Sequence, residues 1–262
     1  MKREIRRAIL SRRFCITALV LLTGYLGYSV PSWAFSADWG YEFRESALHL
    51  SLGGIYYGSV ILLLPFCVCI PYATVQVDEI KSGYFRYAVM RHSVYGYVLS
   101  RVAAGMISSA VLAGGTFLFH AALWNVVGIP YNPAVNPYHE MNISSVCLYY
   151  GFDKMLSAIP IYAYFAVSMG ICAAIWSVAA LAVAVWMADK MLTMVIPVCI
   201  YRLWSSGIPY YLLGVDLPHP SAMFNDGLTY ETFKYSLAAY LVLFVLSFLY
   251  YFCGVSKRGT NA

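Results

Sequence analysis

Long apolar runs alternate with short polar segments along the whole chain. About 20 apolar residues, rising 1.5 Å each, cross a hydrocarbon layer of ~30 Å as a helix. The ten-residue units of alternating polarity that a membrane barrel requires do not occur. The pattern therefore predicts an all-α fold with six transmembrane helices, at residues 14–34, 52–75, 98–127, 155–187, 191–213 and 235–253.

Two of these runs are irregular. Residues 155–188 contain no charged side chain, and as one helix they would measure roughly 50 Å, so we expect a single long helix that projects beyond the bilayer. The fifth run, in contrast, is interrupted by Arg202, Gly207 and Pro209. Irregular backbone at membrane depth must be buried in protein or line water. We therefore expect the fifth span to be broken or re-entrant.

The amino-acid composition supports a polytopic membrane protein. Hydrophobic residues make up 61% of the chain and charged residues 11%, whereas charged residues make up about 25% of soluble globular domains. Residues 1–262 are therefore interpreted as one transmembrane domain.

The distribution of charge predicts the topology. If the N-terminus is cytoplasmic, 13 of the 17 Lys and Arg residues, but only 4 of the 12 acidic residues, fall on cytoplasmic segments, as the positive-inside rule requires. Both termini are then cytoplasmic. The basic arm at residues 1–13 would lie on the anionic inner leaflet. A cleaved signal peptide is the alternative, but the ~17-residue apolar run that follows is longer than the usual hydrophobic region of such peptides.

Motifs for catalysis are missing from the sequence. The dipeptide Gly-Lys does not occur, which excludes a Walker-type phosphate loop. His139-Glu140 begins like a zinc-protease motif, but Ile143 stands where the second His is required. The seven cysteines lie almost all in apolar runs and are interpreted as core residues. We expect no catalytic residue, no metal site and no cofactor in this chain.

Ionisable residues inside the apolar runs are scarce. No Asp or Glu lies in the core of a predicted span, and His120 and Arg202 are the only candidates. A carrier driven by an ion gradient normally needs a buried carboxylate, so this class of transporter is disfavoured. Gly54 and Gly58 form a G-x-x-x-G step, which predicts close packing against another helix.

The longest basic interruption between apolar runs spans residues 76–97. It contains Glu79-Ile-Lys-Ser-Gly83, followed by Arg86 and Arg91. Together with six spans, a basic N-terminal arm and a broken fifth span, this loop resembles the loop after the second span in type-2 permease subunits of ATP-binding cassette exporters. That family often carries Lys where this chain has Arg101.

The resemblance implies a function and a set of partners. In that family, the loop packs on a separate ATPase subunit, which binds ATP and Mg, and two permease subunits enclose the export path. It implies export of an amphipathic or hydrophobic substrate, a second permease subunit (the same or a related chain), contact with membrane lipid, no nucleic acid, and a bacterial plasma membrane. The residues of the ATPase-coupling surface would be Glu79, Lys81, Gly83, Arg86 and Arg91.

Three other functions stay open. An ion-gradient-driven secondary transporter would continue to transport without ATP. A lipid-acting membrane enzyme would need polar catalytic groups gathered at one membrane surface. A non-transporting structural subunit would hold another permease in place without affecting its choice of substrate.

Overall fold

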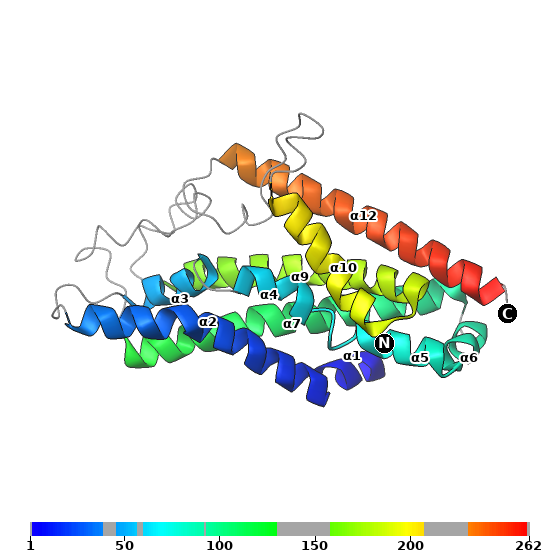
Figure 1. Ribbon diagram of the computed structural model, residues 1–262, viewed down its shortest axis with the longest axis horizontal. Helices are drawn as coiled ribbons and strands as arrows, with labels where there is room; N and C mark the ends of the chain where they lie inside the picture. Colours follow the sequence, from blue (N-terminus) through cyan, green and yellow to red (C-terminus); the bar gives the residue numbers. More distant parts are fainter. Residues whose placement is uncertain are drawn as a thin grey trace.

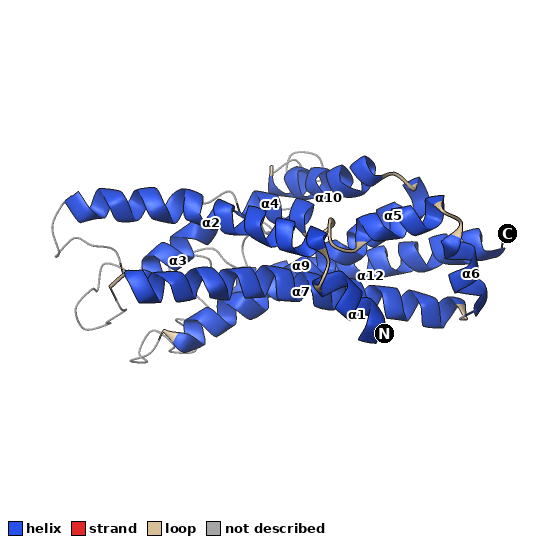
Figure 2. Ribbon diagram, turned by 90° about the horizontal axis from the view of Figure 1, so that it is seen from below, coloured by secondary structure: helices blue, strands red, loops and turns tan. Residues whose placement is uncertain are grey.

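The computed structural model describes residues 2–38, 46–56, 60–91, 93–129, 158–206 and 230–260. Within these ranges every regular element is a helix (Figure 2). One isolated β-bridge joins Ser46 and Ile129. The predicted all-α class is confirmed for this part of the chain. The helices are α1 (Lys2–Ile9), α2 (Arg12–Asp38), α3 (Ala47–Tyr56), α4 (Val60–Cys67), α5 (Ala73–Lys81), α6 (Tyr84–Arg91), α7 (Val94–Val127), α9 (Ile159–Met187), α10 (Lys190–Ser205) and α12 (Tyr230–Thr260).

Four of these helices are long and apolar enough to cross a membrane. They are α2 over Arg12–Phe35, α7 over Val94–Val127, α9 over Ile159–Met187 and α12 over Lys234–Gly259. They coincide with the first, third, fourth and sixth predicted spans. Helices α3 and α4 qualify as a fifth span if the two are taken together. The described residues thus hold four or five candidate spans, as expected of a multi-pass membrane protein.

The second and fifth predicted spans differ from straight helices. In the second, the directions of α3 and α4 differ by 58°, and residues 57–59 between them lie outside the described residues. In the fifth, α10 contains Pro197 and has 16 residues, so its length of about 24 Å falls short of a ~30 Å hydrocarbon layer. Of the three residues expected to interrupt this span, Arg202 lies within α10. Gly207 and Pro209 lie outside the described residues, so a break there stays a prediction.

Helix α9 forms the centre of the bundle. It packs against α7, α12, α10 and α5, and 83% of the residues in its most apolar window are buried, compared with 22% for α2 and 28% for α12. Its many Ala residues allow neighbouring helices to approach closely. The outer helices α2 and α12 carry the apolar surface that a bilayer would cover.

One end of the bundle gathers the short helices. Figures 1 and 2 both place α1, α5 and α6 towards the end where α12 finishes, whereas α3 lies towards the opposite end. The interruption predicted at residues 76–97 is thus largely helical, formed by the end of α5, α6 and the start of α7. At the same end, α9 stops at Ala188, whose φ of 50° is left-handed, and Asp189 caps α10 by accepting a hydrogen bond from the Leu192 amide (3.0 Å).

Candidate functional site

Helix α6 presents a basic outer face. Phe85 and Val89 are buried, whereas Arg86, Met90 and Arg91 are exposed. The residues four apart share a face because an α-helix turns every 3.6 residues. The Phe85 ring packs edge-on against Tyr97 of α7, with ring centroids 5.5 Å apart. Helix α6 is therefore fixed to the bundle by its apolar side and turns its arginines outward.

Gly83 makes the turn from α5 to α6 possible. Its φ of 76° lies in the left-handed region, which residues with a Cβ adopt only at a cost. A Cβ at this position would meet nothing within 4 Å, so the requirement for glycine comes from the backbone conformation alone. The turn redirects the chain so that α6 lies across the end of the bundle (Figure 1).

Beneath this turn, Glu79 of α5 forms an ion pair with Arg101 of α7. Arg101 Nη2 lies 2.7 Å from Glu79 Oε2, and the two side chains are only 5% and 6% exposed. The Tyr72 hydroxyl accepts a hydrogen bond from Arg101 Nη1 (3.0 Å), and the Tyr97 ring lies beside the guanidinium at 5.1 Å. A buried charge needs a partner of opposite charge, and here each group supplies it for the other.

Helix α1 joins the same ion pair. Glu4 Oε2 accepts a hydrogen bond from Arg101 Nη1 (3.0 Å), and Arg7 Nη1 donates to Glu79 Oε1 (3.3 Å). Two carboxylates and two guanidinium groups thus balance in charge between α1, α5 and α7. The N-terminal arm is attached to the protein through these contacts.

A neighbouring pair of contacts is centred on Asp78. Arg13 of α2 donates from Nη2 to Asp78 Oδ2 (2.9 Å), and Lys190 of α10 approaches Asp78 Oδ1 at 2.6 Å. Arg13 also donates to the Thr74 hydroxyl (2.9 Å). The two acidic residues of α5 therefore bind different helices: Glu79 binds α1 and α7, and Asp78 binds α2 and α10.

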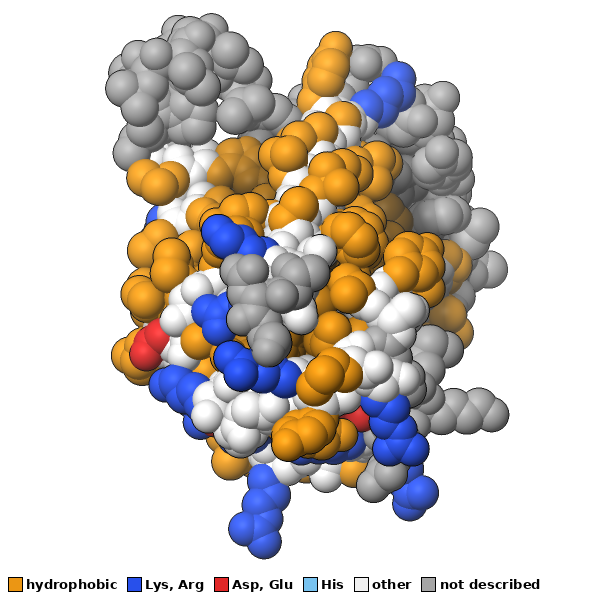
Figure 3. Space-filling model, turned by 90° about the vertical axis from the view of Figure 1, so that its right-hand side faces the viewer, with side chains coloured by type: hydrophobic (Ala, Val, Ile, Leu, Met, Phe, Trp, Pro, Cys, Tyr) orange, Lys and Arg blue, Asp and Glu red, His pale blue; other side chains and the backbone are white. Residues whose placement is uncertain are grey.

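We call these seven side chains the ion cluster: Glu4, Arg7, Arg13, Asp78, Glu79, Arg101 and Lys190. It connects five helices, and its three carboxylates all bind cations within the protein. The surface of this end is left with basic side chains in excess. Figure 3 faces this end and shows several groups of Lys and Arg side chains among hydrophobic ones, with few Asp or Glu.

The two acidic residues of α5 differ in pKa. Burial raises the pKa of Glu79, and although Arg101 and Arg7 oppose this effect, the pKa stays above its usual value. Burial also acts to raise the pKa of Asp78, but hydrogen bonds from Lys190 and Arg13 outweigh it, and the pKa of Asp78 is lowered. Asp78 is half-exposed, so solvent screening weakens its ion pairs.

The residues predicted for the coupling surface separate into two groups. Lys81, Arg86 and Arg91 are exposed, and Gly83 forms the turn between the two helices. Glu79 was expected on the same surface, but it is buried in the ion cluster. Its partners are side chains of this protein, and it does not face outward.

Gly54, one of the two glycines of the predicted G-x-x-x-G step, lies in α3 towards the other end of the bundle (Figure 1). A Cβ on Gly54 would lie 3.1 Å from His120 Cε1 and 3.3 Å from the Tyr25 carbonyl oxygen, so α3 approaches α2 and α7 closely there. Gly58 lies outside the described residues. His120 is buried, and its Nε2 accepts from Trp124 Nε1 (3.0 Å) and lies 3.0 Å from Ser29 Oγ, which gives this histidine a role in joining α2 to α7.

Sequence reasoning predicted Glu79 as a site residue but missed the other six members of the ion cluster: Glu4, Arg7, Arg13, Asp78, Arg101 and Lys190. Arg101 carries the clearest signal, since it is a charged residue at the start of a long apolar run, and such residues are expensive to bury without a partner. Among the described residues no group of His, Cys, Asp or Glu could hold a metal ion.

Comparison with known proteins adds no relative. A scan against models of protein families, a search of curated proteins and a search of solved structures each found no match.

Proposed function

We propose that this chain is the membrane permease subunit of an ATP-driven exporter, and that the outer face of α6 receives a separate ATPase subunit. The ATPase supplies ATP and Mg, while two permease subunits enclose the path of an amphipathic or hydrophobic substrate. In this proposal the chain crosses a bacterial plasma membrane six times, with both termini in the cytoplasm.

The positive-inside rule supports this orientation. Helices α1 and α6 and the end of α12 share one end of the bundle (Figure 1), and this end carries Lys81, Arg86, Arg91, Lys257 and Arg258. Basic residues near the ends of spans favour the cytoplasmic side. The same end is then the one that a soluble ATPase could reach.

The single observation that carries the proposal is the position of α6 above the ion cluster. The outer face of α6 offers Arg86 and Arg91 to a partner, and its inner face packs on α7. Helix α5 precedes it directly and is joined by the ion cluster to α2, α7 and α10. Movement of a docked partner would therefore shift candidate spans as a rigid body, which is what coupling ATP hydrolysis to transport requires.

Co-purification tests the proposal. The tagged chain is extracted from its native membrane in mild detergent, co-purifying proteins are identified, and ATP hydrolysis is measured on the complex. We expect a stoichiometric partner that carries a phosphate-loop motif. The double variant Arg86→Glu/Arg91→Glu should lose this partner and the hydrolysis, because reversing exposed charges removes electrostatic complementarity.

The control is Arg6→Glu/Arg12→Glu, which makes the same change of charge at exposed positions outside α6. This variant should keep the partner. Glu79 is unsuited to charge reversal, because its substitution would disturb the ion cluster as well as any interface. A chain that purifies alone, with no ATPase activity, would contradict the permease proposal.

A further inference from the structure

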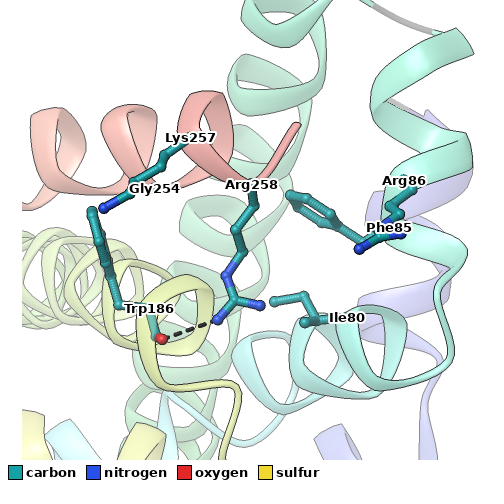
Figure 4. A pocket seen from close by; sticks show the side chains of 7 residues that line it. All are labelled: Ile80, Phe85, Arg86, Trp186, Gly254, Lys257 and Arg258. Carbon is teal, nitrogen blue, oxygen red and sulfur yellow. Dashed lines mark hydrogen bonds between the residues drawn. The ribbon is translucent and has the colours of Figure 1, made fainter. Parts of the chain in front are cut away.

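A basic cavity of about 340 Å³ lies at the same end of the bundle, formed by α5, α6, α9 and α12 (Figure 4). Arg86, Lys257 and Arg258 contribute positive charge, while Phe85 and Trp186 supply aromatic surface. The described residues that line it include no carboxylate. Liquid water occupies ~30 Å³ per molecule, so the space can hold a polar group of several atoms.

Trp186 organises one wall of this cavity. Its indole N–H donates to the Tyr250 carbonyl oxygen (3.0 Å), and its ring stacks on the Tyr250 ring at 4.9 Å. The Trp186 carbonyl oxygen accepts a hydrogen bond from Arg258 Nη2 (3.0 Å), which Figure 4 shows. Lys257 Nζ lies 5.4 Å from the ring centroid. One residue of α9 thus positions both cations of α12.

Gly254 permits this close contact between α9 and α12. A Cβ at this position would overlap Val185 and lie 2.8 Å from Trp186 Nε1, so any larger residue would push Trp186 away. The wall of the cavity therefore depends on the absence of a side chain at Gly254.

The cavity lies where two candidate spans end. Trp186 is the residue before the last of the span Ile159–Met187, and Gly254 lies near the end of the span Lys234–Gly259. Tryptophan is enriched at the boundary between hydrocarbon and water. This places the cavity at the level of the lipid headgroups.

An apolar strip leads from the cavity along α12. Leu246 and Tyr250 precede Gly254 by eight and four residues and therefore share its side of the helix. Their side chains are 61% and 51% exposed, on a helix that is mostly unburied. The strip runs from headgroup level to hydrocarbon depth, where it suits an acyl chain.

We propose that this cavity binds an anionic phospholipid, with the phosphate beside Lys257 and Arg258 and an acyl chain along Leu246 and Tyr250. Basic pockets between membrane helices at the cytoplasmic side are suited to such headgroups. The apolar strip distinguishes a lipid from an acidic peptide or free phosphate, because only a lipid would occupy the cavity and the strip together. The site does not depend on the proposed transport function.

Native mass spectrometry of the purified full-length chain tests this proposal, with titration of phosphatidylglycerol and of phosphatidylcholine. We expect phosphatidylglycerol to bind at least about tenfold more tightly than phosphatidylcholine. The variant Lys257→Gln/Arg258→Gln should weaken phosphatidylglycerol binding by about tenfold or more, because each basic residue near an anionic lipid strengthens binding several-fold. The control Lys81→Gln/Arg91→Gln removes the same charge from the same end outside the cavity, and it should change the affinity less than twofold.

Two results would overturn the site. If both double variants weaken phosphatidylglycerol binding equally, the lipid binds through the overall positive charge of this end and not through the cavity. Displacement of phosphatidylglycerol by equimolar inorganic phosphate would show that the cavity takes phosphate without a lipid. If the double variant does not fold, the single variant Lys257→Gln at an exposed position provides the same comparison, against Lys81→Gln.

Discussion

Arg101 and Glu79, 22 positions apart in the sequence, meet at 2.7 Å in a place where both side chains are almost completely buried. Removing one member of such a pair leaves an uncompensated buried charge. The contact therefore makes the attachment of α5 to α7 sensitive to single substitutions.

The first prediction concerns Arg101→Met. We expect a loss of about 3 kcal/mol or more in the free energy of unfolding, because Glu79 would stay buried without its closest cation. The measurement is the melting temperature in detergent for Arg101→Met, Glu79→Gln and the double variant. The double variant should be more stable than the sum of the single effects predicts, because it removes both charges. Strictly additive effects would show that the two residues are not coupled.

The second prediction concerns Gly83→Ala. The left-handed φ at this position should make the substitution cost about 1–2 kcal/mol, although no atom obstructs the new Cβ. The matched control is Gly115→Ala within α7, where the new Cβ also meets nothing within 4 Å and no positive φ occurs. Alanine should be neutral or stabilising there. Equal melting temperatures for the two variants would argue against the left-handed turn.

The third prediction is that Ala188→Gly stabilises the protein. Ala188 has a φ of 50° at the end of α9, and glycine adopts this conformation without the cost of about 1–2 kcal/mol that a Cβ imposes. The neighbouring variant Ala184→Gly, one turn earlier in α9, should instead destabilise by about 0.5–1 kcal/mol. Thermal unfolding of the two variants should therefore shift in opposite directions, and shifts of the same sign would be evidence against the left-handed cap.

The fourth prediction is a dependence of stability on pH at Asp78. Its pKa is lowered from 3.8 in the folded protein, so ionised Asp78 stabilises the fold above that pH and this contribution is lost as the pH falls through the folded pKa. Asp78→Asn should lower the melting temperature at pH 6, and this effect should become progressively smaller as the pH falls below 3.8. Lys190→Gln should show the same trend. A change in melting temperature that has the same size at every pH would mean that the charge of Asp78 is not its cause.

The sequence predicted the helices α2, α7, α9 and α12 well, because each has an apolar run that is sufficient to identify a span. The difference in direction between α3 and α4 could not be predicted in the same way, since both helices are apolar. The short helix α10 was signalled by the irregular fifth run, although the expected break itself lies outside the described residues.

The candidate site was predictable only in part. The exposed basic face of α6 follows from the positions of Arg86 and Arg91 in the sequence. The ion cluster does not, because Glu4 and Arg101 are 97 residues apart and their pairing depends on how the helices pack. The basic cavity was missed for the same reason: Trp186 and Arg258 come from different helices, and nothing in either segment indicates the other.

The burial of α9 on nearly all sides has a consequence for evolution. A side chain on α2 or α12 that faces lipid can be exchanged for another apolar side chain, since the bilayer adapts to its shape. A side chain on α9 must fit the fixed surfaces of α7, α10 and α12 at close-packed density. As related chains diverge, substitutions should therefore accumulate slowly along α9 and rapidly along the outer faces of α2 and α12.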